Sequence, residues 1–140
     1  MKKSVSLKLI VFSFLLVGAS VSYSAPVFQG GAGSNSTVAG VGNTASKEKS
    51  SAFGYNNTAS GGESSAFGYQ NTASSEESST FGYGNKASGE RSSAFGYENE
   101  ATEKYSSAFG YINKAKGERA SAFGFANLAS GFMSLSFWIC

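Results

Sequence analysis

The sequence predicts an all-β fold, a parallel β-roll solenoid in which each coil is one copy of a fourteen-residue repeat. Three observations lead to this prediction. The repeat runs without a gap over residues 36–133, which makes seven copies, and self-similarity at a fixed period indicates a repeat architecture. Three of its fourteen positions hold the same residue type in every copy. Finally, fourteen residues are too few for a helical hairpin, and the abundant Gly and Ser oppose helix formation.

The invariant positions become visible when the repeats are written as rows that begin at Ser36, so that each position forms a column. Column four is also nearly invariant, with Ala39 in the first row and Phe in the six others. The invariant columns are column five (Gly40 to Gly124), column eight (Asn43 to Asn127) and column ten (Ala45 to Ala129).

Each row is expected to contain two short strands and two turns. The string SSAFGY at residues 50–55 alternates and carries aromatic β-formers, and the NTAS that follows at 57–60 provides a second extended segment. The GGE or SGE between rows supplies turn residues. Coils built in this way stack at about 4.8 Å, so that seven of them reach roughly 30 Å.

A coil this short encloses little space, which decides the direction of its side chains. Alternation in the first strand sends Ala52 and Gly54 to one side and Ser51, Phe53 and Tyr55 to the other. Only the small set fits between strands that lie so close, so we expect an interior of Ala and Gly, completed by the Ala of column ten. The alternative is that the rings point inward and the alanines outward, as in solenoids with wider coils.

An Ala and Gly interior leaves the Phe side chains on an outer face. Each ring carries about 150 to 250 Å² of apolar surface. Even half exposed, six rings exceed the few hundred Å² that a soluble monomer shows in one patch. The stripe therefore needs a cover, and an interface between chains is expected there. Its members are Phe53, Phe67, Phe81, Phe95, Phe109 and Phe123.

The Asn column is expected to be a structural turn ladder rather than a ligand site. An Asn side chain can bond its own turn, and it can also bond the Asn one coil along, which satisfies backbone and amide groups together. The ladder comprises Asn57, Asn71, Asn85, Asn99, Asn113 and Asn127.

The first 24 residues predict a secretory signal peptide. MKK is a basic start, residues 9–17 form an apolar run, and Ser22 and Ser24 fit the positions before a cleavage site. The run is too short to span a bilayer, which disfavours the alternative of a membrane anchor. Residues 25–35 are expected to be a flexible lead-in. The exported chain has a single cysteine, Cys140, so no internal disulfide holds it.

The composition argues against several function classes. The sequence contains no His and no Asp, so neither a Ser-His-Asp nor a Cys-His arrangement can be built, and no catalytic, cofactor or metal residues are predicted. From Ala25 onward, 8 Lys and Arg face 9 Glu, and this balance implies no nucleic-acid partner. The Glu residues gather in columns thirteen and fourteen near Lys and Arg, which is typical of a solvated, mixed-charge edge.

The string ASGERSSAFGYENEA at residues 87–101 resembles the fourteen-residue, haemagglutinin-type head repeat of the YadA-like trimeric autotransporter adhesins, S-x-A-hydrophobic-G-x-x-x-x-A-x-G-x-x. The resemblance implies a left-handed parallel β-roll and three chains around a common axis, with the Phe column at the hydrophobic position of the family's strand. It also implies display on a Gram-negative surface and attachment to host extracellular matrix proteins or cell-surface receptors.

The resemblance ends near residue 133. Residues 134–140 begin an incomplete eighth repeat, in which Trp138 replaces the Gly. Adhesins of this kind continue through a neck and a coiled-coil stalk to a membrane anchor, and we expect no such anchor in this chain. The expected location is the cell surface or outer membrane as part of a full-length adhesin, and otherwise the periplasm or the medium.

Two further hypotheses stay open: a non-functional truncated adhesin, and a curli-like amyloid subunit of a biofilm matrix. The amyloid hypothesis rests on GYNNTA at 54–59, although the Gln columns of curli repeats are missing. An ice-binding face is disfavoured, because a Thr column starts at Thr44, Thr58 and Thr72 but continues with Lys86 and Glu100.

Overall fold

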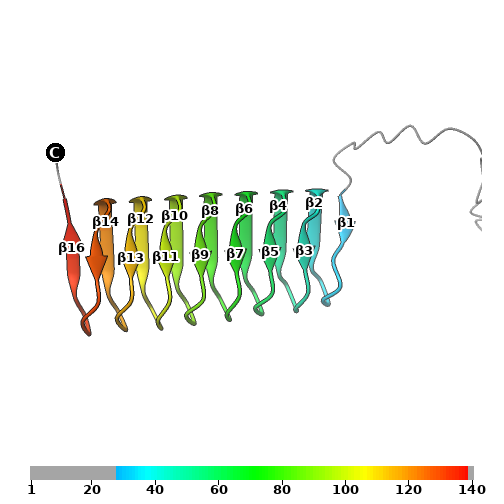
Figure 1. The fold of residues 1–140 in the computed structure, drawn as a ribbon. Coiled ribbons are helices and arrows are strands. Elements are labelled where there is room, and N and C mark those ends of the chain that lie inside the picture. The colour runs from blue at the N-terminus through cyan, green and yellow to red at the C-terminus, as the bar shows by residue number, and fades with distance from the viewer. Residues whose placement is uncertain (1–27, 139–140) are drawn as a thin grey trace, which may run out of the picture.

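The computed structural model describes residues 28–138, and the signal peptide expected at 1–24 lies outside them. The fold is the predicted one, a parallel β-solenoid with about fourteen residues per coil (Figure 1). Each coil contributes one long and one short strand. The solenoid therefore has two sheets, one of nine strands and one of seven.

The long sheet consists of β1 (Gln29–Gly30), β2 (Thr37–Val41), β4 (Ser51–Tyr55), β6 (Ser65–Tyr69), β8 (Ser79–Tyr83), β10 (Ser93–Tyr97), β12 (Ser107–Tyr111), β14 (Ser121–Phe125) and β16 (Leu135–Phe137). The short sheet consists of β3 (Thr44–Ala45), β5 (Thr58–Ala59), β7 (Thr72–Ala73), β9 (Lys86–Ala87), β11 (Glu100–Ala101), β13 (Lys114–Ala115) and β15 (Leu128–Ala129).

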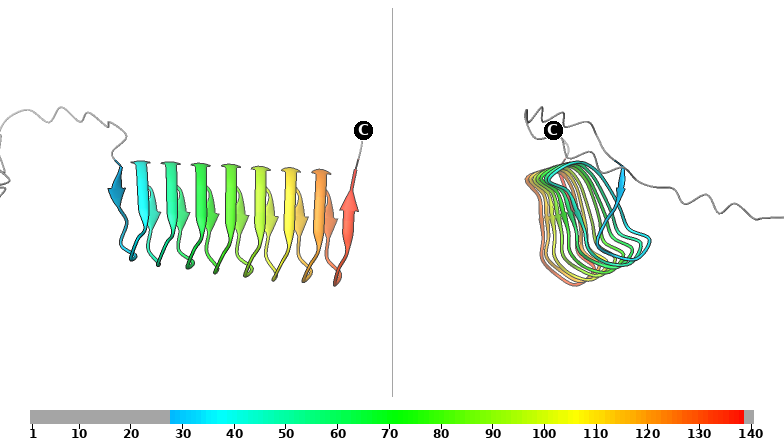
Figure 2. Two further views of the ribbon diagram at one scale, coloured as in Figure 1. Left: turned by 180° about the vertical axis from the view of Figure 1, so that it is seen from behind. Right: turned by 90° about the vertical axis from the view of Figure 1, so that its right-hand side faces the viewer.

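The register between coils turns every column of the sequence into a row of identical neighbours in space. Phe95 pairs with Phe109 and Tyr97 with Tyr111, so each residue lies beside the residue fourteen positions along the chain. Viewed along the solenoid, the coils nearly superpose (Figure 2). A residue type repeated in one column therefore forms a continuous ladder.

The interior is the thin alanine layer that the sequence predicts. Ala52 and Ala59 have no exposed surface, and the same holds for most of their columns. The alternative with inward rings is wrong, because the Phe side chains lie outside this layer and are partly exposed. The alanine layer forms two clusters that divide near Thr80, which takes the place of Ala in its coil and is itself buried.

The Gly column departs from its predicted position. Gly54 and Gly96 are exposed, and the whole column has φ between 105° and 120°, so the Gly marks a bend of the chain rather than part of the interior. A side chain at Gly96 would be crowded, since a Cβ there would collide with the carbonyl oxygen of Gly110 in the next coil. Both the backbone conformation and the close coil contact exclude a side chain.

Two turns in each coil use the left-handed region as well. Columns seven and fourteen have φ between 49° and 68°, mostly at residues other than Gly. Ile112 is the least suited of these, because a β-branched residue rarely adopts this conformation. The turn before most of the long strands is closed by a buried Ser, as where Ser78 Oγ donates to the carbonyl of Ser75 at 2.6 Å. Ala120 takes this place before β14, and the buried hydroxyl of Ser92 has no hydrogen-bond partner.

The two ends of the solenoid continue the long sheet differently. Residues 29–30, within the expected lead-in, form β1, which pairs antiparallel with β2. At the other end β16 keeps the repeat register, with Phe137 beside Phe123. Within residues 28–138 no helix has the length and apolar character needed to cross a membrane.

Candidate functional site

The Phe ladder runs along the outer face of the long sheet. Phe53 and Phe67 stack with ring centroids 4.8 Å apart, and Phe109 stacks on Phe123 at 5.1 Å. Stacking covers much of each ring face, but the side chains stay half-buried or exposed. The structure thus places all six predicted residues in one stripe: Phe53, Phe67, Phe81, Phe95, Phe109 and Phe123.

The stripe is irregular in the middle. Phe67 and Phe81 are 6.4 Å apart at an interplanar angle of 28°, and Phe81 is 58% exposed. Regular stacking resumes between Phe95 and Phe109, at 5.0 Å and 7°. The fourth coil therefore presents the most accessible ring of the stripe.

A second aromatic ladder, which the sequence reasoning missed, lies two residues further along each long strand. Its neighbouring centroids are 4.8–5.3 Å apart, its interplanar angles are 2–11°, and its members are at least 36% exposed. The signal was present in column six, where five rows hold Tyr. The members of this Tyr ladder are Tyr55, Tyr69, Tyr83, Tyr97, Tyr111 and Phe125.

The Asn column is buried and bonded in three directions. Asn85 Nδ2 has three acceptors for its two N–H groups: Asn71 Oδ1 in the preceding coil (2.9 Å), the Phe81 carbonyl in its own coil (3.0 Å) and the Gly96 carbonyl in the next (2.7 Å). Its Oδ1 accepts from the backbone and side-chain nitrogens of Asn99, both at 3.0 Å. The same pattern repeats through most of the set: Asn57, Asn71, Asn85, Asn99, Asn113 and Asn127.

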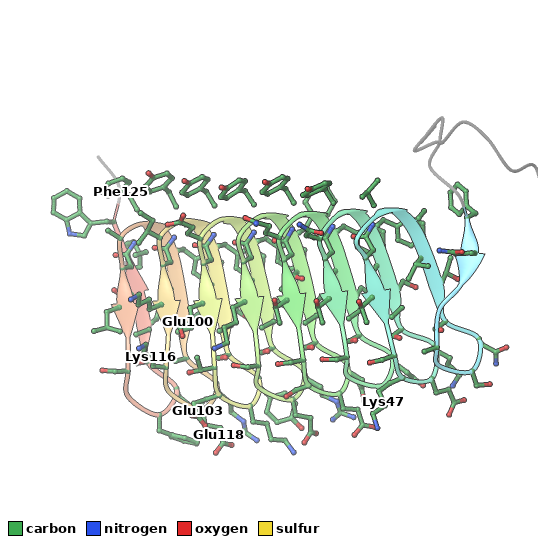
Figure 3. The ribbon with its side chains drawn as sticks, turned by 45° about the vertical axis from the view of Figure 1, so that its right-hand side comes forward. Lys47, Glu100, Glu103, Lys116, Glu118 and Phe125 are labelled. Carbon is green, nitrogen blue, oxygen red and sulfur yellow. The ribbon has the colours of Figure 1, made fainter. Side chains whose placement is uncertain are left out.

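Charged side chains gather at the turns, across the coil from the Tyr ladder. In Figure 3, Phe125 stands at one end of the upper row of rings, and the labelled Lys47, Glu103 and Glu118 lie along the lower edge. Many of these charges are paired between coils, as where Arg91 makes two bonds of 2.9 Å to Glu77. Hydrogen bonding to Arg91 lowers the pKa of the Glu77 carboxyl.

These pairs are exposed and joined one coil to the next, so they offer a solvated edge rather than an acid and base aimed at one substrate. Such exposed pairs contribute little stability each. Among residues 28–138, no three His, Cys, Asp or Glu side chains come together in a way that could hold a metal ion. Within residues 28–138, the surfaces that repeat from coil to coil are the two aromatic ladders and the exposed turns.

The repeat was compared with known families. A family model for the YadA head domain repeat matches residues 32–57, 59–85, 77–99 and 101–127. The chain belongs to the YadA head repeat family. Repeats of this family imply the head of a trimeric autotransporter adhesin, a class exported to the outer membrane and cell surface and generally without enzymatic activity. No match was found among curated proteins.

Proposed function

We propose that this chain is an adhesin head that trimerises through the Phe ladder and attaches bacteria to host extracellular matrix or host cells. The observation that carries the proposal is the outer stripe of six Phe rings in a member of the YadA head repeat family. The trimeric roll of this family, with a left-handed coil, gives the stripe the cover that it needs.

The energetic argument concerns apolar surface. Burial of apolar area stabilises by about 25 cal/mol per Å². Three stripes that meet along one axis cover each other completely, and the register repeats each ring contact in every coil. A three-fold arrangement is closed, so it leaves no stripe open to further chains.

The recognition surface is proposed to lie on the exposed turns. Column seven varies from coil to coil, with Asn56, Gln70 and Glu98 all exposed in the left-handed conformation. Column nine varies as well. A receptor would then contact several coils at once, and three copies of the head would add their weak contacts through multivalency.

Assembly can be tested with a stripe variant and a matched control. Replacing Phe81, Phe95 and Phe109 with Ser should convert trimer to monomer in sedimentation of the mature chain. The control replaces Tyr69, Tyr83 and Tyr97 with Ser, which removes three aromatic rings outside the stripe and should leave the trimer intact. Both are also measured fused to a trimeric coiled coil, where the stripe variant should lower the melting temperature of the head.

A wild-type chain that stays a folded monomer, even at high concentration, and whose melting temperature does not rise on fusion would overturn the interface. Adhesion is tested separately with fused trimers on beads, allowed to settle on surfaces coated with single matrix proteins and on cultured cells. Binding of the trimer, lost in the monomeric stripe variant, is expected. Trimers that bind neither matrix nor cells would refute the adhesive role while leaving the interface intact.

A further inference from the structure

We propose that the Tyr ladder is a binding site for elongated, planar, conjugated aromatic molecules that lie along the solenoid axis. This site goes beyond the adhesive function, and it stands on a different set of side chains. Its members, Tyr55 to Tyr111 in column six and Phe125, form six rings in register on one edge of the solenoid.

The rings form a straight and nearly continuous ridge. Tyr83 and Tyr97 are 4.9 Å apart at 5°, and Tyr97 and Tyr111 are 4.8 Å apart at 8°. Because the ring faces stack on each other, their edges and hydroxyls remain for other contacts. The edge of an aromatic ring carries a positive partial charge, which favours contact with the π face of a second aromatic system.

Backbone without side chains lies beside the ridge. The Gly residues of column five, most of them exposed, separate the Tyr ladder from the Phe ladder. The Cβ position of each Gly is occupied by a carbonyl of the next coil, so these glycines leave no groove. The outer backbone at Gly96 and Gly110 is nevertheless exposed and bare, and a flat molecule can lie against it beside the Tyr rings. The φ of these two glycines, 116°, keeps the position free of larger residues.

The ridge selects a ligand shape. Successive rings repeat by simple translation, so only a straight, rigid molecule contacts several of them at once without bending. A rigid ligand also loses little conformational entropy on binding. Each aromatic contact adds to the affinity beyond the effect of its buried area, so a molecule that spans several rings gains several such contributions.

The charge around the ridge also limits the ligand. The adjoining column seven is neutral from Gly42 to Ala126 except for Glu98. A neutral or singly cationic molecule is therefore accepted, and an anionic one meets the carboxylate of Glu98. Thioflavin T is a suitable probe, because it is flat, elongated and singly cationic, and it becomes fluorescent when its rotation is blocked.

The experiment titrates thioflavin T against the mature chain after high-speed sedimentation has removed aggregates. Saturable fluorescence in the supernatant is expected. Replacing Tyr69, Tyr83, Tyr97 and Tyr111 with Ser should lower the affinity at least tenfold. The matched control replaces the same four residues with Phe, which keeps the rings and removes the hydroxyls, and it should retain the binding. Circular dichroism checks that each variant is folded.

A single Tyr83→Ser variant covers the case in which the fourfold Ser variant does not fold. It divides the ladder into one part with two rings and another with three, so it should still reduce the affinity severalfold. The site is refuted if Tyr83→Ser binds the dye as tightly as the wild type does. It is also refuted if all the fluorescence sediments with aggregates.

Discussion

The Asn ladder and the Tyr ladder reverse the usual distribution of residues between core and surface. In the fourth coil Asn85 is 1% exposed, whereas Tyr83, two residues before it, is 40% exposed. The buried Asn and the exposed Tyr are both stable because the next coil supplies an identical neighbour. The Asn amide finds its hydrogen-bond partners one coil away on both sides, and the Tyr ring finds another ring to cover its faces.

The comparison shows that the presence of an identical neighbour one coil away, rather than the polarity of the side chain, determines which residue types a column of this solenoid can accommodate. A buried polar group is stable when all its partners are supplied, and costly when one is missing. An exposed aromatic ring loses much less when its neighbour is removed, because water already reaches its edge. Substitutions in the two ladders should therefore have very different effects.

The largest effect is expected from Asn85→Ala. The substitution removes the acceptor of the Asn99 amide and the donor to the Gly96 and Phe81 carbonyls, and unsatisfied buried groups cost about 1–3 kcal/mol each. The free energy of unfolding in urea should fall by at least about 3 kcal/mol. Tyr83→Ala, in the same coil, is the control and should change it by about 1 kcal/mol or less. Equal losses would contradict the distinction between the two ladders.

A smaller effect is expected at the bend between the Phe and Tyr ladders. In Gly96→Ala, the new methyl group would meet the carbonyl of Gly110, and its residue would have to adopt φ near 116°. Strain of this kind costs about 1–3 kcal/mol. The control is Gly62→Ala, where a Cβ meets nothing within 4 Å. Thermal melting should separate the two variants, and equal melting temperatures would show that the bend tolerates a side chain.

Column seven lies between the Tyr and Asn ladders, and one substitution there should stabilise the protein. Ile112 holds φ at 56°, and Asn56 occupies the same place in the second coil at 53°. Because the left-handed conformation costs about 1–2 kcal/mol for residues other than Gly and is easier for Asn, Ile112→Asn should raise the stability by up to about 1 kcal/mol. Asn56→Ile is the reciprocal variant and should lose a similar amount. If both changes destabilise, Ile112 contributes contacts that outweigh its strain.

The smallest effect concerns alkaline pH. The charge of Glu98 is the main cause that raises the pKa of Tyr97 above its usual value of 10.0, with burial and the neighbouring tyrosines adding to it. Because the folded state holds this proton more tightly, the resulting stability is complete below pH 10 and is lost as the pH rises through the folded pKa. Melting temperatures between pH 9 and pH 11 should fall less in Glu98→Gln than in the wild type. When Tyr97→Phe is introduced into both chains, their melting temperatures should be indistinguishable over this pH range.

Much of the fold could be predicted from the sequence because the period fixes the register. Once Ala52 and Ala66 were known to be neighbours, the limited space between strands implied the alanine interior. The position of the bend could not be predicted in this way. Gly54 fits an interior by alternation, and only its positive φ, which the spacing does not encode, places it on the outside.

The aromatic surfaces show the same limit. The Phe stripe follows from alternation, and Tyr55 obeys the same alternation. Because a Tyr ring carries a hydroxyl that water can bond, column six does not by itself indicate an apolar surface that must be covered. The hydrogen bond from Ser78 Oγ that closes the turn before β8 also depends on a turn geometry that the repeat does not reveal. The handedness of the coil depends on the path of the chain between strands, and assembly depends on other chains. A column of identical residues determines neither.

The constant register has a consequence for how the gene can vary. Loss of residues 92–105 would place Phe81 beside Phe109, Tyr83 beside Tyr111 and Asn85 beside Asn113, each a pairing of like with like. Recombination between repeats can therefore shorten or lengthen the protein by whole coils without disturbing a single ladder. The length of the solenoid can therefore change in steps of one repeat.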